Sequence, residues 1–451
     1  MNASSADRYG FRHFLRLGWP FLIVIATAPG ATAGDSPGVK VLKERIADNY
    51  PHLRQLYEHI HTHPELSLHE EQTSQRLAQE MRAAGLDVTE HVGGHGIVAI
   101  LKNGAGPTIL VRTDMDALPV TEKTGLPYAS KIRVRDATGR EVGVMHACGH
   151  DMHMSCWIGT ARVLAGLKDR WNGTLVFIGQ PAEEIGTGAR LMLEDGLYRR
   201  FPKPNYAIAL HCDSDAPTGQ VRYTPGQALA NVDSVDITVR GKGGHGAAPH
   251  ATVDPIVLAA RIVLDLQTIV SREMNPTDPT VVTVGSIHGG TKHNIIPDEV
   301  KMQVTVRTMK DSQRQHVLKA IARICKAAAM GARAPEPIVK VDDSQYTPSV
   351  FNDPALTNRL MTAFRRVLGA DHVHERPPVM GGEDFSRYHQ GGVPICIFWL
   401  GAVAPERVEQ AQRTGQPLPS LHSDRFYPVP ETTMKTGILA LTTAVLDLAG
   451  K

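Results

Sequence analysis

The spacing of apolar positions changes along the chain and predicts two kinds of structure. Between about residues 94 and 210, short β-rich apolar runs alternate with helical stretches. This alternation is typical of a mostly parallel sheet built from βαβ units, with helices on both faces. We therefore expect an α/β core with strands at 96–101, 108–112, 174–178 and 206–210 and with helices at 73–84, 152–167 and 189–195.

A strict alternation of apolar and polar residues begins near Val232 and predicts a second sheet. Its elements follow the order β-α-β-β-α-β. Such alternation favours an antiparallel sheet with one face on helices and the other more exposed. The expected strands are 232–239, 280–287, 300–306 and 338–341, and the expected helices are 254–270 and 316–330.

The second unit is self-contained, so we interpret residues 230–343 as an inserted α+β domain that serves in dimerisation or as a lid. Residues 34–229 and 344–451 then form the catalytic, metal-binding core, which ends in a strand at 395–400 and a helix at 431–448. The open antiparallel sheet has edges and helices that can pair with a second copy. We therefore expect a homodimer or a higher homo-oligomer.

Composition restricts the function more than the fold. Lys and Arg number 48 against 46 Asp and Glu, and a net charge of +2 gives no basic footprint for nucleic acid or an anionic membrane. We therefore expect a small-molecule substrate. The 21 histidines often stand beside Asp, Glu, Cys or Gly, which points to metal chemistry.

The first 33 residues are typical of an export signal. Three arginines precede the apolar run 17–26, and Ala31-Thr32-Ala33 stands before Gly34. The alternative is an uncleaved membrane anchor, but the run is shorter than the roughly 20 apolar residues that a spanning helix needs. We therefore expect a mature chain that begins near Gly34, is periplasmic or secreted, and has no stable membrane insertion.

The five cysteines are odd in number, so in an oxidising compartment at least one stays outside any intramolecular disulfide. One of them, Cys148, lies in the densest cluster of ligand-type residues. Cys148 and His150 flank a glycine just before a predicted helix, so a thiolate and an imidazole can converge on one ion. Alternatively, these are polar residues at a helix start, with Asp151 as the cap.

Other polar side chains follow predicted strands. Glu183 and Glu184 come after an apolar strand, His211 ends another, and Asp114 and Asp116 follow a third. Open α/β sheets place their sites at this carboxyl edge. If the glutamate pair is extended, its side chains diverge, and one can reach metal while the other faces substrate. The alternatives are surface acidity for the glutamates, a structural histidine, and a turn or helix cap for the aspartates.

Five motifs, spread in order over about residues 40 to 450, resemble one enzyme family. They are HACGHD at 146–151, QPAEE at 180–184, GKGGH at 241–245, GEDF at 382–385 and LHS at 421–423. Together they are similar to the N-acyl-amino-acid amidohydrolase and hippurate hydrolase branch of the aminoacylase-like metallopeptidases. Plant auxin-conjugate hydrolases belong to the same branch.

The resemblance implies an enzyme that hydrolyses the amide bond of N-acyl amino acids with two divalent ions. It implies a general base, Glu183, and an outer-sphere residue that orients the ligands, Asp116. His245 would steady the oxyanion, in some relatives from the neighbouring protomer, and Asn294 and Arg307 would contact the substrate carboxylate or the oxyanion. The implied metal ligands are Cys148, His150, Glu184, His211 and His422. A thiolate among harder ligands favours zinc, cobalt or manganese.

Two departures bear on the substrate. Relatives of the carboxypeptidase type have a His where Asp114 stands, which favours the acyl-amino-acid branch. Gly382 stands where this branch often has Ser, and Asp424-Arg425 replaces a commoner Pro-His, so the pocket wall is not predicted. A dipeptidase or carboxypeptidase with the same metals is the alternative function. A metal-binding or transport module is a further alternative, but such a module needs no general base.

Overall fold

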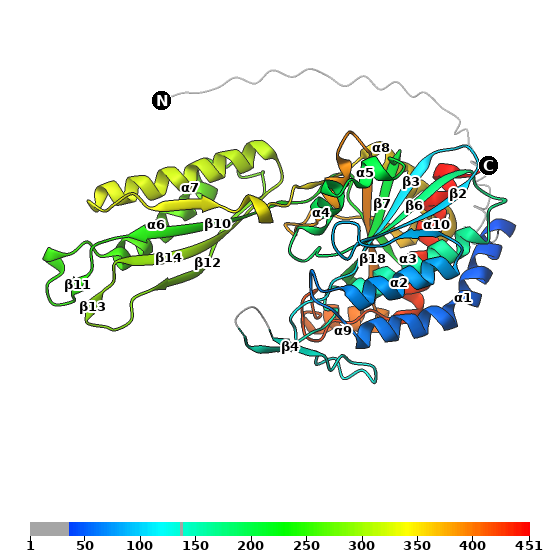
Figure 1. The fold of residues 1–451 in the computed structure, drawn as a ribbon, viewed down its shortest axis with the longest axis horizontal. Coiled ribbons are helices and arrows are strands. Elements are labelled where there is room, and N and C mark those ends of the chain that lie inside the picture. The colour runs from blue at the N-terminus through cyan, green and yellow to red at the C-terminus, as the bar shows by residue number, and fades with distance from the viewer. Residues whose placement is uncertain (1–35, 136–138) are drawn as a thin grey trace, which may run out of the picture. The chain divides into compact units, whose positions relative to one another are not determined.

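The computed structural model describes residues 36–135 and 139–451, and Figure 1 shows two main sheets. The predicted export signal, residues 1–33, lies outside the described residues. Within the described ranges, no helix is long and apolar enough to cross a membrane. The described residues fall in one compact unit, and the domain boundaries at 230 and 343 stay a prediction.

The larger sheet has eight strands. In spatial order they are β1 (Asp87–Thr89), β2 (Ile97–Asn103), β6 (Gly173–Gln180), β3 (Thr108–Asp114), β7 (Tyr206–Pro217), β18 (Ile395–Val403), β8 (Val221–Tyr223) and β17 (Val373–Glu375). The central strands β6, β3, β7 and β18 run parallel, as predicted, whereas β1, β2 and β8 add antiparallel pairings. Both faces are buried, which is why these strands are continuous apolar runs.

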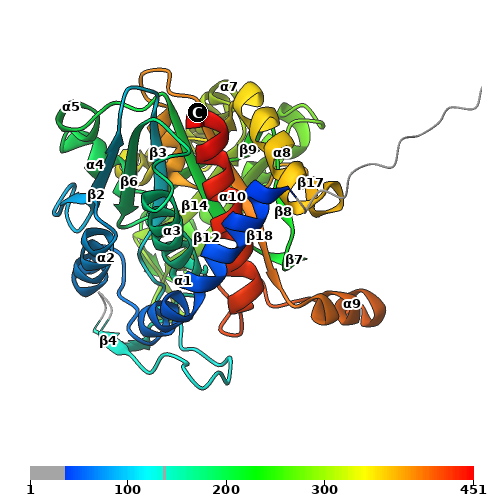
Figure 2. The ribbon, with the colours of Figure 1, turned by 90° about the vertical axis from the view of Figure 1, so that its right-hand side faces the viewer.

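Helices cover both faces of this sheet, as predicted. One face carries α1 (Pro37–Thr62), α2 (Glu71–Ala83), α3 (His150–Ala165), α8 (Pro354–Leu368) and α10 (Pro430–Ala449). Figure 2 shows α1, α3 and α10 lying over the sheet, and these three helices pack against one another. The other face carries α4 (Gly188–Glu194), α5 (Leu197–Arg200) and the 3-10 helix η5 (Asp384–His389).

The smaller sheet has the predicted strand and helix order. Its strands, in spatial order, are β12 (Thr280–Gly289), β14 (Glu299–Thr308), β10 (Asn231–Arg240) and β15 (Ile338–Val341), all paired antiparallel. Helices α6 (Pro255–Thr268) and α7 (Asp311–Gly331) share its apolar core. Asp254 caps α6 by accepting hydrogen bonds from the backbone N–H groups of Ile256 and Val257. The alternate burial along β14 explains why this sheet has one helix-covered face.

The remaining elements are short or peripheral. They are helix α9 (Pro405–Thr414), the strand pairs β4 (Arg133–Arg135) with β5 (Glu141–Gly143), β9 (Gly226–Leu229) with β16 (Val350–Asn352) and β11 (Gly244–His245) with β13 (Ile295–Ile296), the 3-10 helices η1 (Pro249–Ala251), η3 (Asp343–Gln345) and η4 (Ala370–His372), and the π-helical turn η2 (Ile269–Glu273). Pairing between β9 and β16 connects chain segments on either side of the smaller sheet.

Candidate metal centre

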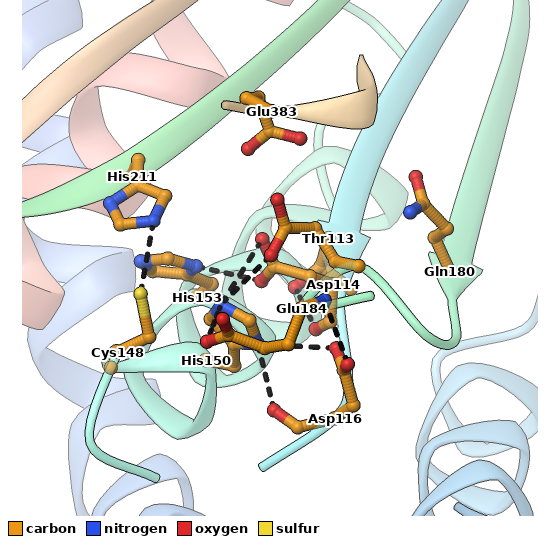
Figure 3. A network of polar contacts seen from close by, with 12 residues as sticks. Thr113, Asp114, Asp116, Cys148, His150, His153, Gln180, Glu184, His211 and Glu383 are labelled. Carbon is orange, nitrogen blue, oxygen red and sulfur yellow. Dashed lines mark hydrogen bonds and ion pairs between the residues drawn. The ribbon is translucent and has the colours of Figure 1, made fainter. Parts of the chain in front are cut away.

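The five predicted metal ligands lie together at the carboxyl edge of the eight-stranded sheet. Potential ligand atoms of one trio lie within 4.8 Å of one another, and the same holds for a second trio. The first trio is Cys148, His150 and His211, and the second is Cys148, Glu184 and His422. Because the two trios share Cys148, all five side chains can serve one pair of adjacent ions. Figure 3 shows four of them, Cys148, His150, Glu184 and His211.

Direct distances support this convergence. Cys148 Sγ lies 3.5 Å from His211 Nε2. Glu184 reaches two histidines: its Oε1 lies 3.7 Å from His150 Nε2 and its Oε2 lies 3.4 Å from His422 Nε2. Glu184 therefore stands between the two groups of ligands.

Gly149 brings Cys148 and His150 to the same centre. Its φ of 83° lies in the left-handed region, and a Cβ at this position would meet Cys212 Sγ at 3.0 Å. A glycine is therefore needed between the two ligands. Gly149 is also the N-cap residue of α3.

Asp151 is not the cap of α3, so that alternative is wrong. It lies in the first turn of the helix, where its negative charge interacts favourably with the helix dipole. Its carboxylate contacts His61 Nδ1 at 2.6 Å, and His61 Nε2 lies 3.1 Å from Glu122 Oε1. This buried contact between α1, α3 and a loop was not predicted from the sequence.

The histidine tautomers fit metal binding. His150 Nδ1 lies 2.8 Å from the backbone oxygen of Asp116, and His211 Nδ1 lies 2.8 Å from the backbone oxygen of Cys212. Because a carbonyl oxygen only accepts hydrogen bonds, each Nδ1 carries a hydrogen, and in the neutral imidazole each Nε2 then has its lone pair for a metal ion. Metal-ligating histidines are typically held in this way.

Buried polar atoms at the centre also fit a cation. His150 Nε2 and Glu184 Oε1 are buried and have no hydrogen-bond partner in the described protein. Burial raises the pKa of Glu184 to about 7. Burial, followed by the nearby carboxylates of Glu383 and Glu184, raises the pKa of Glu183 well above its usual range. Divalent ions would relieve both the unmet hydrogen-bonding capacity and the crowding of negative charge.

A tight turn after β6 presents the two adjacent glutamates. The N–H of Ala182 donates to Glu70 Oε1 at 2.8 Å, and the N–H of Glu184 donates to Asp116 Oδ2 at 3.0 Å. Ala182 has a φ of 52°, in the left-handed region that is unfavourable for a residue with a side chain. Asp116 thus holds both Glu184, through its carboxylate, and His150, through its backbone oxygen.

The condition that the glutamate pair is extended is not met, because Gly186 N–H donates to Glu183 O at 2.7 Å and closes a turn. Both carboxylates approach His150, with Glu183 Oε2 4.0 Å from His150 Nε2. Their other neighbours differ, however. Glu184 groups with Cys148 and His422, whereas Glu183 groups with Glu383 and Asp384.

His422 belongs to a loop far along the chain that is tied to the same segment. Its backbone N–H donates to Ala147 O at 2.9 Å, next to Cys148. His422 also has a left-handed φ of 67°. This hydrogen bond explains how the LHS motif reaches the centre.

Arg112 is a charged residue of the site that was not predicted from the sequence. Its guanidinium is fully buried in β3 and contacts Asp114 Oδ2 at 2.7 Å, Glu383 Oε1 at 2.9 Å and Asp384 Oδ1 at 3.3 Å. It also donates to Gln180 Oε1 at 3.0 Å. Arg112 therefore supplies one buried positive charge to this group of three carboxylates.

Asp114 and His153 form a second buried pair below the centre. His153 Nδ1 lies 2.7 Å from Asp114 Oδ1, and His153 Nε2 accepts the N–H of Cys212 at 2.7 Å. Both nitrogens of His153 are thus used by the protein. The spacing of His150 and His153, three residues apart at the start of a helix, was the signal that could have identified this pair.

A pocket of about 890 Å³ opens onto the metal centre. Glu183, Glu184, His211 and His422 line it, and so does Arg307 of β14. Arg307 Nε donates to Thr305 Oγ1 at 3.2 Å and its Nη1 to Met380 O at 3.5 Å, and no carboxylate among the described residues pairs with it. A half-buried arginine without an acidic partner is suited to an anionic ligand.

His245 and Asn294 do not line this pocket. They lie together and exposed, because Gly246 N–H donates to Asn294 O and β11 pairs with β13. Figure 1 shows this strand pair at one end of the four-stranded sheet. Strand β14 begins at Glu299, at the same end of the sheet as this strand pair, and Arg307 lies near its other end. The eight residues from Glu299 to Arg307 span roughly 26 Å at the usual rise per residue.

All five cysteines are buried and free. Burial, followed by the charge of Glu184, raises the pKa of the Cys148 thiol well above its usual range. A bound cation is what makes a thiolate favourable at such a position.

Comparisons with known proteins identify the family to which the chain is similar. A model of peptidase family M20/M25/M40 matches residues 110–414. N-acetylcysteine deacetylase of Bacillus subtilis is 38% identical over 77% of this chain and 87% of its own. Thermostable carboxypeptidase 1 of Saccharolobus solfataricus is 35% identical over 92% of this chain and 99% of its own. The crystal structure of a dinuclear metal-binding M20 peptidase from Bacillus subtilis superposes with a TM-score of 0.70, at 29% identity over 91% of this chain and 99% of its own.

Proposed function

The chain belongs to the amidohydrolase branch of peptidase family M20/M25/M40 and is a hydrolase of carbon–nitrogen bonds. From this membership and from the site, we propose that the protein hydrolyses the amide bond of N-acyl amino acids. The products are a carboxylic acid and a free amino acid. One observation carries the proposal: five side chains of the kinds that bind metal converge at a pocket that Glu183 and Arg307 also line. Among the described residues, no carboxylate pairs with Arg307.

The proposed cofactor is a pair of divalent ions, of zinc, manganese or cobalt. Cys148, His150, Glu184, His211 and His422 would hold them, and the ions would supply an activated water and polarise the scissile carbonyl. Thiol, imidazole and carboxylate together suit these metals better than magnesium or calcium.

The chain's own groups then perform the remaining steps. Glu183 takes the proton of the attacking water and delivers it to the leaving amide nitrogen, a role worth roughly 10²–10⁴ in rate. Its neighbours, Glu383 and Asp384, are held by Arg112 rather than by the metal ligands. Arg307 binds the carboxylate of the amino-acid product half. Asp116 fixes His150 and Glu184 in place.

A carboxypeptidase or dipeptidase is the second candidate, because relatives with both kinds of name lie at similar identity. The two functions differ in the acyl half, which in a dipeptide carries a free amino group. The experiment compares hippurate, an N-acetyl amino acid and a dipeptide as substrates of the protein reconstituted with each metal. We expect kcat/KM at least about tenfold higher for an N-acyl amino acid than for the dipeptide, and the reverse order would favour the second candidate.

We propose that the protein is a homo-oligomer in which His245 serves the site of a partner protomer. Within one chain His245 lies at the end of β14 remote from Arg307, so the same-chain residue is poorly placed to steady an oxyanion. Mixing His245→Ala with Glu183→Gln protein should restore up to about a quarter of the sites in randomly exchanged dimers.

Exchange of protomers is checked first with differently tagged chains. A His250→Ala chain, altered at a second exposed histidine of the same segment, is the control and should need no complementation. If exchanged His245→Ala and Glu183→Gln dimers stay inactive, His245 acts within its own chain or has no catalytic role.

We also propose that the chain is exported and cleaved near Gly34, on the basic start and the apolar run before Ala31-Thr32-Ala33. N-terminal sequencing of protein from the cell fractions tests this. We expect the mature chain outside the cytoplasm with an N-terminus close to Gly34. An intact Met1 in the cytoplasmic fraction would contradict export.

A further inference from the structure

A second wall of the pocket is polar but is not part of the metal centre. It comprises Asp213, Arg376 and Trp399, which we call the Arg376 wall, and all three line the pocket. Trp399 of β18 pairs in register with His211 of β7, so the two side chains lie side by side on one face of the sheet. Asp213 follows two positions after His211 on the same strand, and therefore on the same face.

The Arg376 guanidinium is held by this wall. It lies 4.8 Å above the centroid of the Trp399 ring, and its Nη1 donates to Asp213 Oδ2 at 2.9 Å. The backbone of Arg376 is also fixed: its N–H donates to Tyr223 O, and its carbonyl accepts the hydroxyl of Thr224, each at 2.8 Å. The Arg376 wall is therefore preorganised: its hydrogen bonds form without a substrate.

Arg307 and Arg376 differ in whether a carboxylate of the protein neutralises them. Arg376 shares Asp213 with Arg222, and Arg222 also pairs with Asp215, so two arginines face two aspartates. Arg307 has hydrogen bonds only to uncharged oxygens within the described chain. If the proposed function is right, the substrate carboxylate goes to Arg307, and the wall beside His211 is left for the acyl half.

An acyl group that packs against the Arg376 wall must form hydrogen bonds with the polar atoms of the wall. In the part of the chain that the structure describes, Asp213 is the only acceptor recorded for the Arg376 guanidinium, which leaves further N–H donors for water or ligand. When an acyl group expels that water, unmatched donors cost free energy unless the ligand replaces the hydrogen bonds. A hydroxyl both accepts and donates, so it can satisfy Arg376 and Asp213 together.

We propose that the Arg376 wall is a specificity-determining acyl subsite for groups that combine a flat apolar body with a hydroxyl group at the far end, as in a 4-hydroxybenzoyl group. Two apolar residues that line the same pocket, Ile397 and Val379, would contact the body of the acyl group, and the Asp213–Arg376 pair would recognise its polar end. This inference rests on the proposed function and adds the substrate class to it.

The test measures the ratio of kcat/KM for 4-hydroxyhippurate to kcat/KM for hippurate. These two substrates differ only in the hydroxyl group. We expect a ratio of at least about ten in the wild-type protein, because a site built for a hydrogen bond rejects the analogue that lacks the partner. In Arg376→Met the ratio should fall to near one, and a ratio near one in the wild-type protein overturns the proposal.

Arg222→Met is the matched control. It removes a neighbouring arginine that also pairs with Asp213 but does not line the pocket, and the ratio should persist. An equal loss of the ratio in both variants would mean that the wall acts only through general structure. If Arg376→Met does not fold, Arg376→Lys is used, because lysine keeps the charge and loses the planar stack on Trp399.

A second readout is independent of turnover and of metal. Calorimetry measures binding of 4-hydroxybenzoate and benzoate to the metal-free protein. We expect tighter binding of the hydroxylated acid, with the difference lost in Arg376→Met, and no difference in the wild-type protein would contradict the subsite. If none of the N-acyl amino acids is hydrolysed but this binding difference is present, the proposed function fails and the subsite stands.

Discussion

Glu183→Gln is expected to keep its metal and to lose at least about 10²-fold in kcat, whereas Glu184→Gln is expected to lose metal. The two residues are adjacent and chemically identical, so the contrast depends only on their neighbours. Glu184 groups with Cys148 and His422, while Glu183 groups with carboxylates that Arg112 neutralises. Glutamine keeps the shape of the side chain and removes its ability to accept a proton.

Metal content by mass spectrometry, measured beside kcat on each variant, tests this assignment. Glu194→Gln, an exposed glutamate of α4, is the control and should change neither quantity. If Glu183→Gln loses metal and Glu184→Gln keeps it, the two roles are reversed. Near-normal activity in both variants would contradict the hydrolytic mechanism as a whole.

Arg112→Met is expected to lower the free energy of unfolding by about 3–5 kcal/mol, because it leaves several buried carboxylates without a counter-charge. The guanidinium is fully buried and contacts Asp114, Glu383 and Asp384. The substitution removes the cost of desolvating the arginine, which opposes folding. It also leaves the desolvated carboxylates without their counter-charge, and this larger loss sets the sign of the effect.

Thermal denaturation measures the effect of Arg112→Met. Arg82→Met provides the matched control, because Arg82 pairs with Glu90 at the surface, where such pairs contribute about 0–1 kcal/mol. We expect Tm to fall by several degrees in Arg112→Met and by much less in Arg82→Met. Equal changes in Tm would mean that the buried group reorganises or takes up protons at little cost.

Much of the fold was predictable because its signals are local. The apolar runs of β3, β6, β7 and β18 are buried on both faces, and each alternating strand of the smaller sheet packs on helices. The antiparallel strands at the sheet edges were not predicted, since β1, β8 and β17 have three residues each and carry little pattern. Helix α1 was also missed.

The candidate site was predictable where its residues follow strand ends or form motifs. The supporting contacts were not, because they join residues far apart in sequence. Arg112 and Glu383 are 271 positions apart, and His61 and Asp151 are 90 apart. A basic residue directly after the apolar run of a buried strand, β3, was the signal for Arg112. His245 lies in β11, away from the residues that line the pocket, and no local pattern in the sequence encodes that separation.

Ala182 and His422 have left-handed backbone conformations in the segments that form the candidate metal centre. Each such residue costs about 1–2 kcal/mol compared with glycine. Selection for a more heat-resistant variant would therefore favour Ala182→Gly on local energy, yet glycine would broaden the ensemble of the turn that aims two carboxylates. Thermostability and catalytic precision thus compete at this position, and laboratory evolution toward one should be accompanied by loss of the other.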